Sequence, residues 1–167
     1  MLLPKGIRTS PPVCVLNATK ALFTGHLHFL QEHTGKVILM DDGQSFRIFR
    51  HVRLEAAESC IESREAVFIV RFKFAHFSQR ANRLASCIPI PLIVGFPGFR
   101  DKIWAVNDTT GYWQGMYQFE SPQAIEAYRN SFVLRVMNNR TIPDSLSYKI
   151  LPETSLVRYI RAHVHAN

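Results

Sequence analysis

Hydrophobic spacing in the N-terminal third of the chain predicts a helix followed by a β-hairpin. Residues 1–17 form an irregular lead, and apolar side chains between residues 18 and 33 then recur at a spacing typical of one helix face. The segment 37–54 contains two apolar runs separated by a turn at Asp42-Gly43. An Asp-Gly pair between apolar runs favours a tight hairpin, so two paired strands are expected here.

The middle of the chain alternates strand-like and helix-like segments in the order β-α-β-β-α-β. Ser78 and Ser121 are suited to cap two helices, and Pro122 fits the first helical position after Ser121. The strands are expected at 66–75, 99–107, 112–119 and 146–151. The second helix is expected to bury a stripe formed by Ile125, Tyr128, Phe132 and Val136. This order predicts an antiparallel four-stranded sheet with helices on one face only.

These segments divide the chain into three parts. Residues 1–64 form an N-terminal extension that ends in a polar linker at 55–64, residues 65–152 form an α+β ferredoxin-like domain, and residues 153–167 form a basic tail. The sheet face without helices is expected to face solvent, to bind a ligand or to pack on a second copy. The extension is a candidate to cover that face, to extend an interface with a second copy or to form a lid over a cavity. A helical tail would be amphipathic and would pack on its own domain or touch an anionic membrane.

Composition narrows the class of protein. The chain has 167 residues, 47% of them hydrophobic, which is enough for the core of one domain. A net charge of +7 favours an anionic partner, although basic residues spread along the chain also fit a solvated surface. Cys14, Cys60 and Cys87 form no CxxC pair, which indicates a reducing compartment. No apolar run is long enough to cross a bilayer, so a cytoplasmic protein without an integral membrane segment is expected.

Several short motifs then occur in an order typical of one family. They are Pro97-Gly98-Phe99, Lys102-Ile103-Trp104, the segment 107–111, the segment 115–119 and the segment 124–128. Together they resemble the YdhR-type monooxygenases, which belong to the superfamily of dimeric α/β barrels that includes the antibiotic-biosynthesis monooxygenases. The resemblance covers residues 65–151, about half of the chain.

The resemblance implies a fold, an assembly and a class of reaction. It implies a homodimer, a dimeric α/β barrel in which the sheets of two copies face each other. It also implies a cavity between each sheet and its own helices. The expected activity is the oxidation of a small aromatic, quinol-like or polyketide-like molecule without a metal or flavin, so no cofactor is expected.

A cofactor-free oxidation needs a base and a dry aromatic cavity with few polar groups. His76 follows the first strand of the domain and is the candidate base. Trp104 and Tyr117 on the central hairpin are candidate cavity walls, and Asn107 and Lys102 are candidates to orient a substrate oxygen. A structural interpretation is favoured over the catalytic one: the two aromatic residues fit a core or a dimer interface, and His76 fits a surface or capping histidine.

Metal binding is not favoured by the pattern of the seven histidines. His26 and His28 are two residues apart, which places them on nearly opposite sides of a helix. His163 and His165 would share a face of a strand, but neither a HExxH motif nor a CxxC pair accompanies them. No metal site is therefore predicted.

Two other classes of function compete with the enzyme. The RNA-recognition motif has the same element order, but the strand at 112–119 lacks the basic residue and the spacing that this motif requires, so no nucleic-acid partner is predicted. A non-catalytic dimer that binds a small molecule needs the cavity but no base. The sequence leaves this second alternative open.

Overall fold

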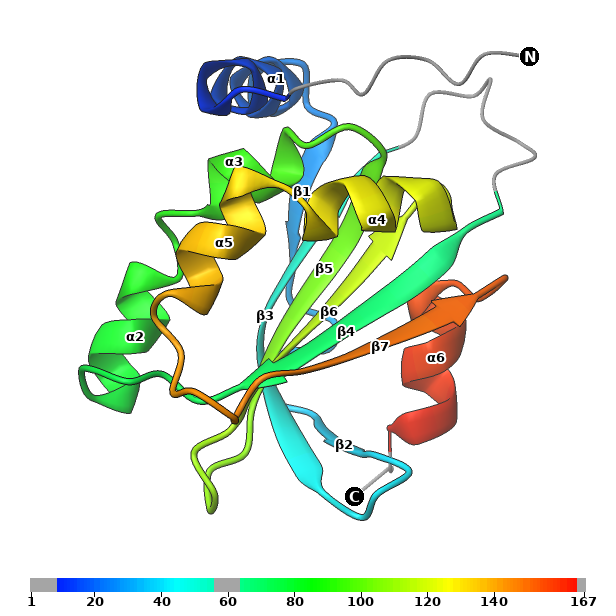
Figure 1. The fold of residues 1–167 in the computed structure, drawn as a ribbon. Helices are drawn as coiled ribbons and strands as arrows, with labels where there is room; N and C mark the ends of the chain where they lie inside the picture. Colours follow the sequence, from blue (N-terminus) through cyan, green and yellow to red (C-terminus); the bar gives the residue numbers. More distant parts are fainter. Residues whose placement is uncertain (1–8, 56–63, 165–167) are drawn as a thin grey trace.

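One antiparallel sheet of seven strands forms the centre of the structure, a computed structural model that describes residues 9–55 and 64–164 (Figure 1). The strands are β1 (Leu27–Leu30), β2 (Val37–Leu39), β3 (Ser45–Leu54), β4 (Ala66–Phe72), β5 (Phe99–Val106), β6 (Trp113–Phe119) and β7 (Ser147–Pro152). The helices are α1 (Pro11–Phe23), α2 (Gln79–Ala85), α3 (Ile90–Val94), α4 (Pro122–Arg129), α5 (Phe132–Asn138) and α6 (Leu156–His163). The order across the sheet is β1-β3-β5-β6-β4-β7, and β2 pairs with β3.

The predicted β-α-β-β-α-β order is confirmed between β4 and β7, except that each predicted helix is divided into two. Serine caps fix where several helices begin. The hydroxyl oxygens of Ser78, Ser121 and Ser155 accept hydrogen bonds from backbone N–H groups three residues later. Each cap satisfies an N–H group that would otherwise have no partner in the first turn. Ser78 and Ser121 were both predicted as caps from the sequence.

A third cap, at Ser131, changes the second predicted helix. Its hydroxyl accepts from the backbone N–H of Leu134, so the chain starts a new helix, α5, two residues after α4 ends. Because of this break, Val133 and Leu134 form the buried face of α5, whereas Phe132 and Val136 are 37% and 47% exposed. The predicted stripe was therefore right in α4 and wrong in α5.

The N-terminal helix begins and ends earlier than predicted. Pro11 and Pro12 lie in its first turn, where proline is tolerated because the N–H groups there have no helical acceptor. The chain then turns at Gly25 with φ 75°, and Leu27–Leu30 pairs with β3 as β1. The predicted helix at 18–33 is therefore wrong beyond residue 23, because pairing with a distant strand outweighs local helical spacing.

The predicted hairpin is confirmed as β2 and β3, and it extends the same sheet because β3 also pairs with β5. Most of the predicted linker at 55–64 lies outside the described residues, as do Cys60, His165 and the first eight residues. Among the described helices, none is both long and apolar enough to cross a membrane.

The helix-side face of the sheet carries the larger core. Phe68, Trp104 and Tyr117 point from the strands towards this face, where they pack with buried residues of α3, α4 and α5. Each large side chain buried in this way contributes about 1.5–3 kcal/mol to folding. Helix α1 is held against α3 at Gly95, whose missing Cβ leaves room for the backbone of Cys14.

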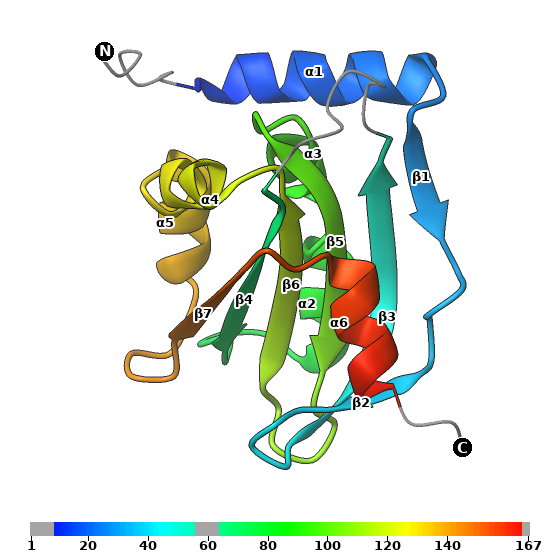
Figure 2. The same ribbon diagram turned by 90° about the vertical axis from the view of Figure 1, so that its right-hand side faces the viewer.

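The opposite face, called here the second face, is partly covered by the C-terminal helix. Helix α6 lies over this face of the sheet (Figure 2). Its residues Leu156, Tyr159 and Ile160 belong to one buried cluster with Ile103 and Met116 of the sheet. The prediction that helices lie on one face only is therefore wrong. The reason is the amphipathic tail, whose apolar stripe packs on its own sheet.

Helix α1 does not cover the second face, because it packs on α3. Other parts of the N-terminal extension do reach it: the His33 ring stacks on that of His51, and Ile38 and Met40 belong to the same cluster as α6.

Candidate active site

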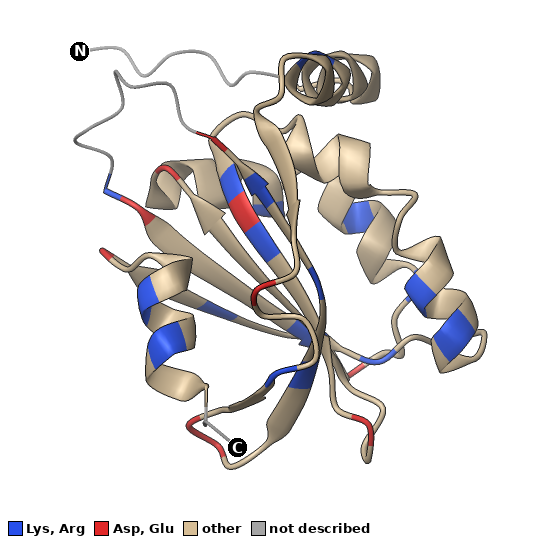
Figure 3. Ribbon diagram, turned by 180° about the vertical axis from the view of Figure 1, so that it is seen from behind, with Lys and Arg blue, Asp and Glu red and all other residues tan. Residues whose placement is uncertain are grey.

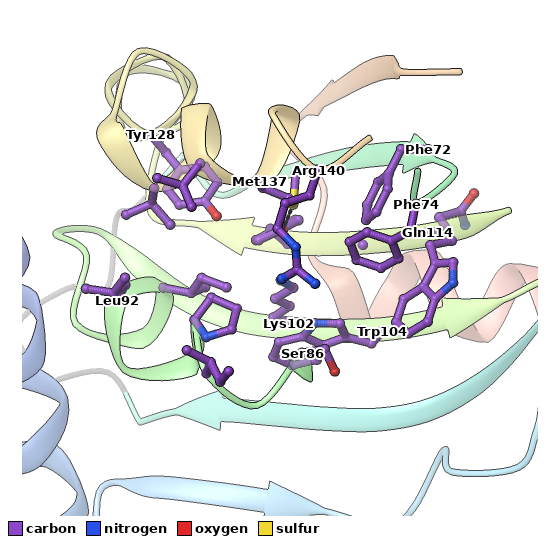
Figure 4. A pocket seen from close by; sticks show the side chains of 18 residues that line it. Phe72, Phe74, Ser86, Leu92, Lys102, Trp104, Gln114, Tyr128, Met137 and Arg140 are labelled. Carbon is purple, nitrogen blue, oxygen red and sulfur yellow. Dashed lines mark hydrogen bonds between the residues drawn. The ribbon is translucent and has the colours of Figure 1, made fainter. Parts of the chain in front are cut away.

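A cavity of about 150 Å³ lies between the helix-side face of the sheet and helices α3, α4 and α5. Its lining is mostly aromatic and aliphatic, and includes Phe72, Phe74, Trp104, Trp113, Tyr117 and Tyr128 (Figure 4). A dry apolar cavity of this size accommodates one aromatic ring. Ile88 and Val136 also line it and are 78% and 47% exposed, so they mark its solvent side. The predicted cavity between sheet and helices is present.

Three predicted site residues meet in this cavity. Lys102 and Trp104 are two residues apart on β5, so both point to the same face, and Lys102 is the register partner of Tyr117 on β6. All three line the cavity. Gly115 makes room for them, since a Cβ at that position would lie 2.8 Å from the Tyr117 ring.

The other two predicted residues do not line the cavity. The side-chain oxygen of Asn107 accepts hydrogen bonds from the backbone N–H groups of Thr109 and Thr110, at 3.0 and 2.8 Å, and thereby shapes the turn after β5. His76 is exposed in the loop after β4, where its carbonyl accepts from the Asn82 side chain. The geometry gives neither residue access to a ligand in the cavity.

Lys102 is the unusual group in the cavity. It is 2% exposed, and its Nζ lies 4.1 Å from the ring centroids of both Trp104 and Tyr117. Within residues 9–55 and 64–164, no carboxylate pairs with it and no acceptor takes a hydrogen bond from its amine. Burial lowers the pKa of Lys102 well below its ordinary value, and the nearby charge of Arg50 lowers it further.

Two effects on the protonation of Lys102 oppose each other. The faces of the two rings attract an ammonium group, by about 0.5–2 kcal/mol each. Removing an amine from water disfavours its charged form, and this desolvation is the main cause of the lowered pKa of Lys102. The amine therefore loses its proton more readily than a surface lysine and is suited to act as a base.

Arg50 of β3 packs against the Trp104 ring beside Lys102. Its guanidinium carbon lies 5.6 Å from the centroid of the Trp104 ring. Its Nη1 donates to the hydroxyl of Ser86, which also lines the cavity, and its Nη2 donates to the carbonyl of Arg83. Arg50 thus orients Trp104 and places a positive charge near Lys102.

Tyr117 and Tyr128 supply the neutral hydroxyl groups of the cavity. Their ring centroids are 5.4 Å apart, and both residues are about 1% exposed. Burial raises the pKa of both phenols, and the interaction with Tyr128 offsets part of this effect at Tyr117. The Tyr117 hydroxyl has only a weak acceptor, the Met137 sulfur at 3.9 Å. It can therefore donate a hydrogen bond to an oxygen of a ligand.

Several lining residues were not anticipated from the sequence. Phe74 stacks edge-on against Trp113 at 4.9 Å, and the Arg140 guanidinium lies 5.1 Å from the Phe74 centroid. Arg140 follows α5, and Figure 4 shows it extending into the cavity. Arg50, Ser86 and Arg140 come from three separate segments, and no local pattern marks them as neighbours.

A second group of buried polar side chains lies on the second face. His51 Nε2 is 2.7 Å from one carboxylate oxygen of Asp101, and Arg53 Nε donates to the other at 2.8 Å. The ring of His33 stacks on that of His51 with centroids 5.5 Å apart. Seen from behind, basic and acidic positions lie side by side along the central strands of the ribbon (Figure 3).

The described residues contain no group of three or more His, Cys, Asp or Glu side chains arranged to hold a metal ion. His163 of the predicted terminal pair contacts Asp41, with Nε2 and Oδ1 3.1 Å apart. Its expected companion, His165, lies outside the described residues.

The sheet, its helices and the cavity between them define an α+β protein with a cavity lined mostly by aromatic and aliphatic side chains. The family model described as "Putative mono-oxygenase ydhR" matches residues 68–158. The match covers more than half of the chain, and the chain belongs to this family. The resemblance predicted from the motifs is therefore confirmed.

Other comparisons add little beyond the family. A solved structure entitled "Crystal structure study of anthrone oxidase-like protein" is similar with 13% identity and a TM-score of 0.46. The similarity covers 65% of this chain and 54% of that one, so the chain spans about half the length of that protein. The search of curated proteins found no match.

Proposed function

We propose that this protein is a cofactor-independent monooxygenase that oxidises a small aromatic or polyketide-like molecule in the helix-side cavity, with Lys102 as the base. Family membership supports the reaction class. The observation that carries the proposal is the position of Lys102, a buried amine without a counter-ion between two aromatic rings. Natural cores rarely retain such a group, because an unpaired buried charge costs several kcal/mol.

The first step is removal of a proton from an acidic O–H or C–H group of the substrate. The neutral amine of Lys102 takes this proton, and the ammonium that forms is stabilised by the Trp104 and Tyr117 rings and by the substrate anion. The Tyr117 hydroxyl, whose present acceptor is weak, donates to the negatively charged oxygen. Lys102 thus replaces His76 as the proposed base.

The second step is reaction of the electron-rich anion with molecular oxygen. For a CH₂ group next to an aryl ketone, the carbanion transfers an electron to oxygen and the radical pair forms a C–O bond. Lys102 returns its proton to the resulting peroxide anion. Removal of the second C–H proton then breaks the O–O bond and releases water. The CH₂ group and O₂ become a C=O group and H₂O, with no other oxidant required.

Oxygen consumption tests this proposal. Metal-free protein with chelator present is mixed with hydroquinones, which match the one-ring cavity, and with the larger naphthols and anthrones, which could enter only by extending past its solvent side, and oxygen uptake is recorded. We expect uptake with at least one of these compounds, loss of uptake in Lys102→Met, and full uptake in the surface control His76→Ala. Uptake that persists in Lys102→Met and is lost in His76→Ala would contradict the assignment of the base. Absence of uptake with retained binding would identify a non-catalytic binding protein.

We further propose the homodimer expected for the family. The position of α6 restricts its geometry, because Leu156, Tyr159 and Ile160 already occupy part of the second face. A face-to-face dimer then uses the portions of the sheet beside α6. Light scattering coupled to size-exclusion chromatography is expected to give twice the mass of one chain, and a monomeric mass at micromolar concentration would contradict the dimer.

A further inference from the structure

Lys102 differs from the other described lysines in both burial and surroundings. Lys20, Lys36 and Lys149 are exposed, and Lys149 pairs with Asp41 at 3.1 Å. Lys73 is half-buried and lies over the Tyr112 ring at 4.6 Å. Among the described lysines, only Lys102 is buried and also lines a cavity large enough for a ligand. Its amine is therefore accessible to a molecule in the cavity but shielded from bulk water.

We propose that Lys102 forms a reversible imine with a small aromatic aldehyde or ketone that enters the cavity. The nucleophile in this reaction is an unprotonated amine, and a desolvated lysine in an apolar pocket provides it at neutral pH. The lowered pKa of Lys102 agrees with the geometry. Surface lysines remain almost fully protonated under the same conditions.

The bond changes use only groups present in the cavity. The Lys102 nitrogen attacks the carbonyl carbon to give a carbinolamine, after proton transfer from nitrogen to oxygen. Loss of the hydroxyl as water then forms the C=N bond. The amine and carbonyl compound thus become an imine and one water molecule, without oxidation or reduction. The Tyr117 hydroxyl is placed to donate to the carbonyl oxygen during the attack.

The cavity also selects the carbonyl compound. Its volume of about 150 Å³ fits one ring, and the Trp104 and Tyr117 rings on either side of the amine favour an aryl group over a flexible chain. Within the lining, no carboxylate attracts a cationic ligand. Benzaldehyde is therefore a suitable probe.

Imine formation uses the same cavity as the proposed oxidation but needs no oxygen, so the two proposals can fail separately. Anaerobic protein at pH 7 is incubated with benzaldehyde and reduced with sodium cyanoborohydride, and the product is analysed by intact mass and peptide mapping. We expect one benzyl group per chain on Lys102, with about tenfold or more labelling over any other lysine, since each pKa unit changes the free-amine fraction tenfold.

Matched variants and a competitor decide the outcome. Lys102→Met is expected to lose the label and Lys73→Met to retain it. In the wild-type protein, toluene is expected to protect Lys102, which tests the cavity without any substitution. Equal labelling of Lys20, Lys36 and Lys102, or labelling that toluene does not reduce, would overturn the proposal.

Discussion

Two neighbouring residues of β5 show how differently the two faces of the sheet treat a buried charge. Asp101 and Lys102 are 3% and 2% exposed, and they point to opposite faces. Asp101 contacts His51 and Arg53, both at hydrogen-bond distance. Lys102 contacts two aromatic rings and, within the described residues, has no carboxylate partner.

The difference distinguishes a charged group with a structural role, Asp101, from a group suited to chemistry, Lys102. A buried carboxylate with two partners recovers much of its desolvation cost, and its geometry is fixed by those partners. A buried amine without a partner does not recover its desolvation cost, and its pKa is lowered as a result. Retained unpaired groups in a cavity are the expected mark of a functional site.

The largest effect is expected from Asp101→Ala. Removing the carboxylate leaves His51 and Arg53 without their shared partner, and breaking a buried pair costs about 3–5 kcal/mol of unfolding free energy. Urea denaturation measures this loss. The matched control is Asp108→Ala, which removes a half-exposed pair with Arg47 and should cost about 0–1 kcal/mol. Equal losses in the two variants would show that the pair on the second face is not structural.

Lys102→Met is expected to stabilise the protein at pH 7. Methionine fills similar space without a buried group that lacks a partner, so we expect a gain of about 1–3 kcal/mol in unfolding free energy. The same substitution should abolish oxygen uptake. A loss of stability together with retained uptake would mean that Lys102 is a structural residue.

The stability of the wild-type protein should also depend on pH through Lys102. Its pKa is lowered in the folded state, so between this value and the ordinary lysine pKa the unfolded chain binds one more proton than the folded chain. Stability relative to Lys102→Met therefore rises with pH in this window, by up to about 1.4 kcal/mol per pH unit. Urea titrations of both proteins between pH 7 and about pH 10 measure the difference. A difference that does not change with pH would contradict the lowered pKa.

Arg50→Met should shift the pH dependence of the reaction. Arg50 lowers the pKa of Lys102, so its removal raises that pKa and moves the rise of kcat/KM to higher pH, by up to about one unit. The control Arg47→Met removes an exposed arginine from the same strand. A change in rate at every pH without a shift would mean that Arg50 acts only by holding Trp104.

The smallest change in stability is expected from Tyr117→Phe. Its hydroxyl donates to the Met137 sulfur at 3.9 Å and interacts with the Tyr128 hydroxyl, so the unfolding free energy should change by about 1 kcal/mol. A fall in kcat of about tenfold or more with little change in KM is expected if the hydroxyl binds the developing oxyanion. An unchanged kcat would remove Tyr117 from the mechanism.

The sequence predicted the parts of the site that lie on one hairpin. Strand periodicity puts Lys102 and Trp104 on one face, and the β5–β6 pairing brings Tyr117 to Lys102. The sequence did not place His76 correctly. This residue follows β4 in the chain, but it lies in an exposed loop and does not line the cavity. The sequence also missed Arg50, which reaches the site through the pairing of β3 with β5.

The same limit applies to the fold. Serine caps and turn residues are local signals, and they correctly located the helix starts at Ser78 and Ser121. The position of α6 depends on contacts between its apolar stripe and residues of several strands on the second face. These strands are brought together only by the folded sheet, so local sequence does not predict the position of the helix. Likewise, His51 and Asp101 are 50 residues apart in the chain, and only strand pairing makes them neighbours.

The proposed role of Lys102 requires an amine whose pKa lies well below the ordinary lysine value. Its titration can be followed directly by NMR of lysine side chains labelled with ¹³C and ¹⁵N, with the Lys102 signals assigned by their absence in Lys102→Met. We predict that these signals titrate well below the ordinary lysine range, while those of Lys20 and Lys36 titrate within it. Titration of Lys102 together with the surface lysines would contradict the account.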